Sequence, residues 1–142
     1  MQHQRLILFC FAAAVAATFQ AAIGCVGTKR QTVHVANNFS ADDNASLLLA
    51  HCASKDDDFG VKSLGPPNQE FNWSFCPRII FRDTLYFCHL FWGAKQRAFV
   101  AYDEKWRLRG DETEHHWLAE DGGIYYYNDG DTPIKVKTFD WQ

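Results

Sequence analysis

The chain alternates between short runs of β-branched or aromatic residues and clusters of residues that favour turns. In the clearest run, Phe71, Trp73 and Phe75 are separated by single polar residues. A period of two residues is typical of a β-strand with one buried face, and no amphipathic helical stretch of useful length occurs. Since 142 residues leave room for one domain, the sequence predicts a single all-β domain.

Candidate strands recur along the chain, and their number predicts an antiparallel β-sandwich of about eight strands. The run at 84–92 is almost wholly apolar, which predicts a central strand that is covered on both faces or carries a bulge. Gly122 and Gly123 predict a tight hairpin turn. The candidate strands are 32–39, 47–52, 61–64, 71–76, 84–92, 97–102, 116–119, 124–127 and 134–139.

Residues 1–24 predict a signal peptide that is removed on export. A short polar start with one cation precedes an apolar run, and small residues follow. Ala22 and Gly24 fit the small-residue rule for cleavage before Cys25, and cleavage after Ala22 is the alternative. The apolar run is too short to span a bilayer comfortably, and no later stretch is long enough. We therefore expect a secreted, extracellular domain at 25–142 with no stable membrane insertion.

Export determines how the cysteines should behave. Cys25, Cys52, Cys76 and Cys88 remain after cleavage, and cysteines in an oxidising compartment usually pair. Four cysteines can pair in more than one way, and their spacing does not select among the connectivities. We therefore expect disulfides among these residues and leave the pairing open.

Three N-glycosylation sequons, at Asn38, Asn44 and Asn72, support export. Asn38 and Asn44 lie in a polar, turn-like stretch, whereas Asn72 lies inside a predicted strand. The formal net charge of -3 argues against a basic face, so we expect no nucleic-acid partner.

Four motifs occur in a fixed order over nearly the whole predicted mature chain. Together they resemble the plant self-incompatibility protein S1 family. The motifs are His-Cys-Ala-Ser-Lys-Asp-Asp-Asp-Phe-Gly at 51–60, Phe-Asn-Trp-Ser-Phe at 71–75, Thr-Leu-Tyr-Phe-Cys-His-Leu-Phe-Trp at 84–92, and Trp117 followed by Gly-Ile-Tyr at 123–125.

The cysteines depart from the pattern of that family. Its members usually have two further cysteines shortly before the last motif, and 105–116 contains none here. Cys52 and Cys88 are kept, whereas Cys76 is additional. The disulfide pairing of that family therefore cannot be transferred to this chain. We expect one bridge among Cys52, Cys76 and Cys88, with Cys25 as the candidate partner of the remaining thiol.

The resemblance implies a compact, secreted, disulfide-bonded β-sandwich. For the founding members it also implies a ligand role, in which a stigma protein meets a receptor on incompatible pollen and triggers calcium signalling. We therefore expect a small secreted glycoprotein that acts as an extracellular recognition ligand for a cell-surface receptor. The alternative is a structural or defence-related protein that binds cell-wall carbohydrate through Tyr125 or Tyr127, without a dedicated receptor.

No sequence pattern predicts an enzyme, a cofactor or a metal centre. The motifs G-x-S-x-G and H-E-x-x-H do not occur, and Cys88 and His89 would diverge as neighbours on a strand. His115 and His116 would diverge in the same way, so the pair would chelate poorly even with His51 or His89.

The acidic turn of the first motif has two interpretations. Asp56, Asp57 and Asp58 carry the carboxylates that Ca²⁺ prefers, but their spacing matches no known calcium loop. Aspartates also shape turns by accepting bonds from backbone N–H groups, and Gly60 tolerates a positive φ. We expect these four residues to shape a hairpin turn.

Partner contacts are expected on loops, because the strands of a sandwich are committed to packing. The charged segment 105–114 is the first candidate, since it carries both signs of charge, and 66–70 is the second. The candidate contact residues in the first segment are Arg107, Arg109, Asp111 and Glu112.

Overall fold

The computed structural model describes residues 24–40, 47–78, 80–81, 83–109, 112–128 and 135–142, without the side chains of 107–109. The predicted signal peptide, apart from Gly24, lies outside these residues. No helix in the described part of the chain has the length and hydrophobicity needed to cross a bilayer. The elements are β1 (Gln31–Asn37), β2 (Leu48–Ser54), β3 (Asp58–Leu64), β4 (Glu70–Phe75), β5 (Leu85–Trp92), β6 (Lys95–Asp103), the 3-10 helix η1 (Glu104–Arg109), β7 (Glu114–Glu120), β8 (Gly123–Asn128) and β9 (Val136–Phe139).

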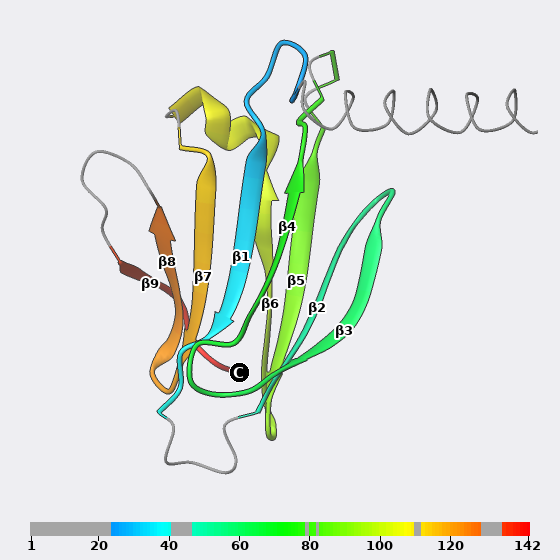
Figure 1. Ribbon diagram of the computed structural model, residues 1–142. Helices are drawn as coiled ribbons and strands as arrows, with labels where there is room; N and C mark the ends of the chain where they lie inside the picture. Colours follow the sequence, from blue (N-terminus) through cyan, green and yellow to red (C-terminus); the bar gives the residue numbers. More distant parts are fainter. Residues whose placement is uncertain (1–23, 41–46, 79, 82, 110–111, 129–134) are drawn as a thin grey trace, which may run out of the picture.

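The strands form two sheets that pack face to face, which confirms the predicted β-sandwich (Figure 1). The larger sheet has the order β4-β1-β7-β8-β9, and the smaller has the order β3-β2-β5-β6. Neighbouring strands are antiparallel except β1 and β7, which run parallel. The sequence analysis expected antiparallel strands throughout. In the larger sheet β1 lies between β4 and β7, and in the sequence the strands β5 and β6 of the smaller sheet come between β4 and β7. This long connection allows β7 to lie parallel to β1.

Alternation along the strands divides the core from the outer faces. In β4, Trp73 is buried between the sheets, while Asn72 and Ser74 are exposed, as the two-residue period predicted. In β1, Val33 and Val35 are fully buried on the same inner side. Burying such side chains is the main favourable term in folding, so this inner layer defines the register of both sheets.

The apolar strand β5 lies between β2 and β6, at the centre of the smaller sheet. Its ladder with β6 shifts register between Tyr86 and Phe87, so Ala101 of β6 has no residue opposite it. A bulge is therefore present in this ladder, but its extra residue lies on β6 and not on the strand for which it was predicted. The predicted coverage of β5 on both faces is not found, because the Phe87 side chain remains 46% exposed on the outer face.

Trp117 of β7 ties the two sheets together at this bulge. Its side chain is buried, and its indole Nε1 donates a hydrogen bond to the carbonyl oxygen of Ala101 at 3.0 Å. A bulge leaves its extra residue out of the ladder, and a buried carbonyl without a partner is costly. The indole therefore supplies a donor to this buried carbonyl from the opposite sheet.

Two disulfides join all four described cysteines. Cys52 and Cys88 face each other on β2 and β5 and are fully buried, and their sulfurs are bonded. The second bridge, Cys25–Cys76, ties the segment before β1 to the end of β4. The pairing of β2 with β5 therefore accounts for the Cys52–Cys88 bridge. The position of the segment before β1 beside the end of β4 accounts for the Cys25–Cys76 bridge. Cysteine spacing in the sequence had left both pairings open.

The segment 105–114 is more regular than the predicted charged loop. The helix η1 already covers Glu104–Arg109, and β7 begins at Glu114. The buried carboxylate of Glu104 accepts a hydrogen bond from the Tyr102 hydroxyl at 3.0 Å. The charged residues of this segment predicted a solvated loop, so the sequence analysis did not foresee the burial of the preceding Glu104.

We predict that Trp117→Phe lowers the free energy of unfolding by about 1–3 kcal/mol, because it leaves the buried Ala101 carbonyl without a donor. A urea titration would show a lower midpoint with an unchanged slope. Trp141→Phe is the matched control, since its indole donates to the carbonyl of Glu120 at 2.8 Å in a half-buried position that water can reach. Equal losses in the two variants would contradict this account.

Candidate functional site

Four segments meet at one end of the sandwich, which we call the upper end (Figure 1). They are the turn between β2 and β3, the described part of the connection between β4 and β5, the helix η1, and the segment that precedes β1. The connection at 65–69, which includes most of the second predicted contact loop, lies at the opposite end. The two predicted contact loops therefore do not form one surface.

The acidic turn closes the β2–β3 hairpin through its own hydrogen bonds. Ser54 Oγ accepts the backbone N–H groups of Asp56 and Asp57 at 3.3 and 3.1 Å. Asp58 Oδ1 accepts the N–H of Gly60 at 2.9 Å, and Gly60 has a φ of 70°. These bonds support the turn-shaping role that the sequence analysis assigned to the acidic motif.

A histidine fixes the base of the same turn. His51 Nε2 lies 2.7 Å from Asp58 Oδ1. The pKa of Asp58 is held below its ordinary value, first by the hydrogen bond from the Gly60 backbone and then by the bond to His51. Hydrogen bonds to the ionised form of a carboxyl favour that form, so Asp58 serves the turn as a carboxylate.

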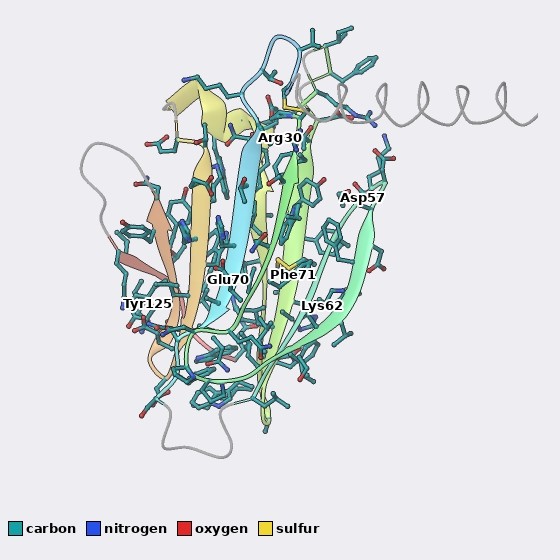
Figure 2. All side chains as sticks on the ribbon, in the orientation of Figure 1. Arg30, Asp57, Lys62, Glu70, Phe71 and Tyr125 are labelled. Carbon is teal, nitrogen blue, oxygen red and sulfur yellow. A yellow bond between two sulfur atoms is a disulfide. The ribbon has the colours of Figure 1, made fainter. Side chains whose placement is uncertain are left out.

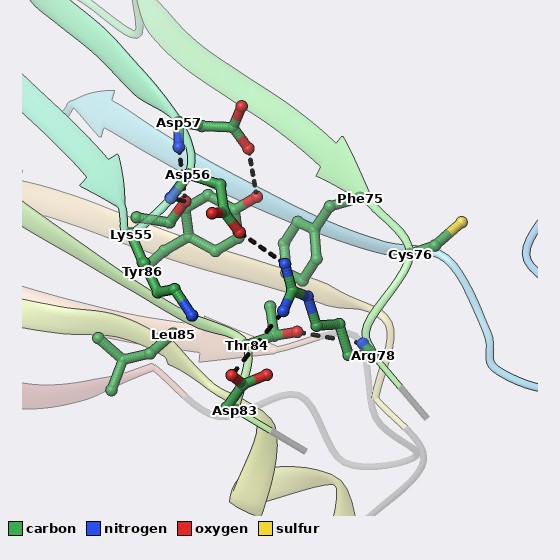
Figure 3. A pocket seen from close by; sticks show the side chains of 11 residues that line it. Lys55, Asp56, Asp57, Phe75, Cys76, Arg78, Asp83, Thr84, Leu85 and Tyr86 are labelled. Atoms are coloured by element: carbon green, nitrogen blue, oxygen red, sulfur yellow. Dashed lines mark hydrogen bonds and ion pairs between the residues drawn. The ribbon is translucent and has the colours of Figure 1, made fainter. Parts of the chain in front are cut away.

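A polar pocket of about 200 Å³ lies beside the turn (Figure 3). Arg78 spans it, with Nη2 at 2.7 Å from Asp56 Oδ2 and Nη1 at 3.9 Å from Asp83 Oδ2. On the far side, the Tyr86 hydroxyl donates to Asp57 Oδ2 at 3.4 Å. The guanidinium thus links the β4–β5 connection to the β2–β3 turn, and its charge is already matched by carboxylates.

The tyrosine of this pocket is held in its neutral form. Burial raises the pKa of the Tyr86 hydroxyl, and the negative charge of Asp57 raises it further. A neutral hydroxyl can donate to Asp57, whereas a phenolate could not. The network of Asp56, Asp57, Arg78 and Tyr86 therefore fits a role in holding the surface rigid better than one in acid–base chemistry.

An apolar tip projects next to this pocket. Val26, Ile80 and Phe81 are 79, 84 and 75% exposed and line one shallow hollow. The Cys25–Cys76 disulfide lies at the base of the tip, and Arg78 borders both the hollow and the polar pocket. Exposed apolar side chains gathered in one place with a polar rim are typical of an interaction surface.

The sequence analysis did not identify this tip. Residues Ile80 and Phe81 belong to an apolar run at 79–81 that is bounded by Arg78 and Arg82 and was assigned to no strand. An apolar run outside every predicted strand is the signal that could have revealed it, because such residues have no sheet face in which to be buried.

The predicted contact residues of 105–114 fall only partly within the described structure. The side chains of Arg107 and Arg109 and the whole of Asp111 lie outside it, and Glu112 is half-buried. The helix η1 does lie at the upper end, as does the β4–β5 connection (Figure 1).

The described sequons differ in their surroundings. Asn38 follows β1 at the lower end, and its amide Nδ2 donates to Glu120 Oε2 at 2.7 Å. Asn72 is exposed on β4, an edge strand, where its amide donates to Glu70 Oε1 at 3.3 Å. Asn44 lies outside the described residues.

The tyrosine strand is less open than the carbohydrate alternative requires. Tyr126 faces inward, with its ring centroid 4.9 Å from that of Trp117. Tyr125 is on the outer face (Figure 2), and Lys135 Nζ lies over its ring at 4.8 Å from the centroid. The ring of Tyr127 lies against His116 at 5.6 Å. Both outer tyrosines are half-buried and already in contact with a neighbouring side chain, which leaves less ring surface for stacking on a sugar.

Comparison with known proteins gives a consistent result. The family model described as plant self-incompatibility protein S1 matches residues 32–141. The chain is 32% identical to S-protein homolog 21 of Arabidopsis thaliana over 114 residues, which cover 78% of this chain and 83% of that protein. It is 38% identical to S-protein homolog 2 of the same plant over 118 residues, which cover 80% and 66% of the two chains.

A shorter match, to S-protein homolog 4 of Arabidopsis thaliana, has 36% identity over 77 residues and covers 54% of this chain and 48% of that protein. The chain thus spans less than two thirds of the length of some curated relatives and more of others. No solved structure gives a significant match.

We predict that the carboxyl of Asp58 titrates below an ordinary aspartate in NMR, and that His51→Gln raises its pKa only partway. The remaining depression is expected because the Gly60 backbone bond is unchanged. The stabilisation of the turn is present above the pKa of an unfolded aspartate and is lost as the pH falls through the lower native pKa. An ordinary Asp58 pKa in the His51→Gln protein would show that the backbone bond is not the main cause.

Proposed function

Because the chain belongs to the plant self-incompatibility protein S1 family, we propose that it is a secreted recognition ligand for a cell-surface receptor. It acts by binding and not by catalysis. The receptor engages the upper end, with the apolar tip as the central contact and the charges of Arg78 and η1 around it. The partner surface is therefore an apolar pocket in a receptor ectodomain with a mixed-charge rim.

The observation that carries this proposal is the exposure of the apolar tip on a rigid base. Val26, Ile80 and Phe81 keep most of their surface in water, which is unfavourable unless a partner covers them. The Cys25–Cys76 bridge and the Arg78 ion pairs hold the surrounding backbone in place. A rigid surface loses little entropy on binding, so this arrangement favours specific recognition.

The surroundings of the tip also support an extracellular role. Both disulfides would be favoured in an oxidising compartment. A glycan on Asn38 would occupy the lower end of the sandwich and would leave the tip uncovered. Glycosylation and recognition are therefore compatible on one small domain.

We predict that Phe81→Asp or Ile80→Asp weakens saturable binding of the labelled protein to plant protoplasts by roughly tenfold or more, as expected for a central apolar contact. Val61→Asp is the matched control, because Val61 is 62% exposed on β3, outside the tip. Neutralising predicted contact charges of 105–114, as in Arg107→Gln with Glu112→Gln, should also weaken binding.

The same assay separates the alternatives. If Tyr125→Ala or Tyr127→Ala reduces binding more than Phe81→Asp does, the carbohydrate-binding hypothesis is favoured and the receptor proposal fails. If Val61→Asp is as damaging as Phe81→Asp, the contact surface is not the tip.

Export is tested separately by mass spectrometry of protein secreted from a plant or insect host. We expect an N-terminus at Cys25, no free thiol among the four remaining cysteines, and glycan on Asn38, Asn44 or Asn72. Retention in the cell with free thiols would overturn the extracellular role. Peptide mapping without reduction would identify the bridges as Cys25–Cys76 and Cys52–Cys88.

A further inference from the structure

The outer face of the larger sheet brings together three metal-ligating side chains from two adjacent strands. His34 of β1 and His116 of β7 are direct partners in the parallel register. Glu114 lies two residues before His116, so both side chains emerge on the same face of β7. The candidate ligand atoms of His34, Glu114 and His116 all lie within 4.8 Å of one another.

The contacts within this cluster are close. His34 Nε2 lies 2.6 Å from Glu114 Oε2, and the imidazole rings of His34 and His116 stack with their centroids 4.2 Å apart. All three residues are half-buried, so the cluster is at the surface but partly shielded from water. The two rings are nearly parallel, with an interplanar angle of 12°, so binding of one ion requires both imidazoles to tilt toward a common point.

A second carboxylate orients the first histidine. Glu70 Oε1 of β4 lies 3.2 Å from His34 Nδ1, so both ring nitrogens of His34 face carboxylate oxygens. A neutral imidazole has one N–H and can donate to only one of the two. If a cation replaces the proton between Nε2 and Glu114, the N–H of His34 resides on Nδ1 and donates to Glu70, so that Nε2 and Glu114 both become ligands.

We propose that His34, Glu114 and His116 form a binding site for a divalent transition-metal ion, with zinc as the best fit. Two imidazoles and one carboxylate are a ligand set that zinc accepts, with a fourth position left for water or for a group of another molecule. Glu70 completes the site as the carboxylate that orients His34, an arrangement common around metal-bound histidines. This inference does not depend on the proposed receptor role.

The sequence analysis considered His116 only with its neighbour His115 and with His51 or His89. Those residues lie elsewhere. His115 faces the core, where its ring nitrogens lie 2.6 Å from the Tyr126 hydroxyl and 2.8 Å from Gln31 Oε1. His51 and His89 belong to the smaller sheet. The relevant partner, His34, is brought to His116 by the parallel pairing of β1 and β7, which sequence spacing does not reveal.

The test is calorimetric titration of zinc chloride into the disulfide-bonded chain, purified without a histidine tag. We expect one zinc ion per chain, loss of that binding in His34→Gln, His116→Gln and Glu114→Gln, and a roughly 10–100-fold weaker affinity in Glu70→Gln. Unfolding midpoints measured without metal should identify any variant that is misfolded, and the remaining ligand variants then decide the outcome.

The matched control is His51→Gln. His51 and Asp58 also form a histidine–carboxylate pair, at 2.7 Å, but among the described residues they are not joined by a third ligand. Unchanged zinc binding in this control, together with zinc-dependent NMR shifts of the His34 and His116 rings alone, would support the site. Absence of binding by the unmodified chain, or an equal loss in His51→Gln, would overturn it.

Discussion

The sandwich depends on contact between two sheets across a core rich in aromatic side chains, and Trp117 is one of the points where that contact is also polar. Its indole occupies the inner layer and gives its N–H to a carbonyl that the bulge in β6 leaves outside the ladder. The bulge and the tryptophan are thus mutually dependent. Without the bulge the indole nitrogen would be buried without this acceptor, and without the indole the bulge would leave a polar atom unpaired. This satisfied pair therefore contributes, with the apolar core, to the relative position of the sheets.

Most of the fold could be predicted because its signals are local. The alternation around Trp73 and the apolar run around Cys88 each identify a strand without knowledge of its neighbours. The order of strands could not be predicted in the same way. Nothing near His34 in the sequence indicates that His116 will be its partner, since the pairing arises only when two sheets close around a common core. The same reason kept the disulfide connectivity open.

The candidate sites also differ in whether local sequence or the whole fold determines them. The acidic turn is a local structure, and its role in shaping the hairpin was predicted from its residues. The apolar tip is a local segment too, but its significance depends on what surrounds it. Ile80 and Phe81 could have been core residues until the structure placed them in solvent. Exposure is a property of the whole fold, so sequence patterns alone could not distinguish a contact surface from buried packing.

The parallel pairing of β1 with β7 also constrains the order in which the molecule can assemble. During synthesis β1 leaves the ribosome long before β7, and its other neighbour, β4, also comes later. The hairpins β2–β3, β5–β6 and β7–β8 join strands close in sequence and can form early, whereas β1 must wait for distant partners. The strand β1, which lies between β4 and β7 in the larger sheet, is therefore among the last to be enclosed. Before β4 and β7 are in place, the unpaired backbone of β1 can form hydrogen bonds with other chains and so promote aggregation. Molecular chaperones limit aggregation of this kind.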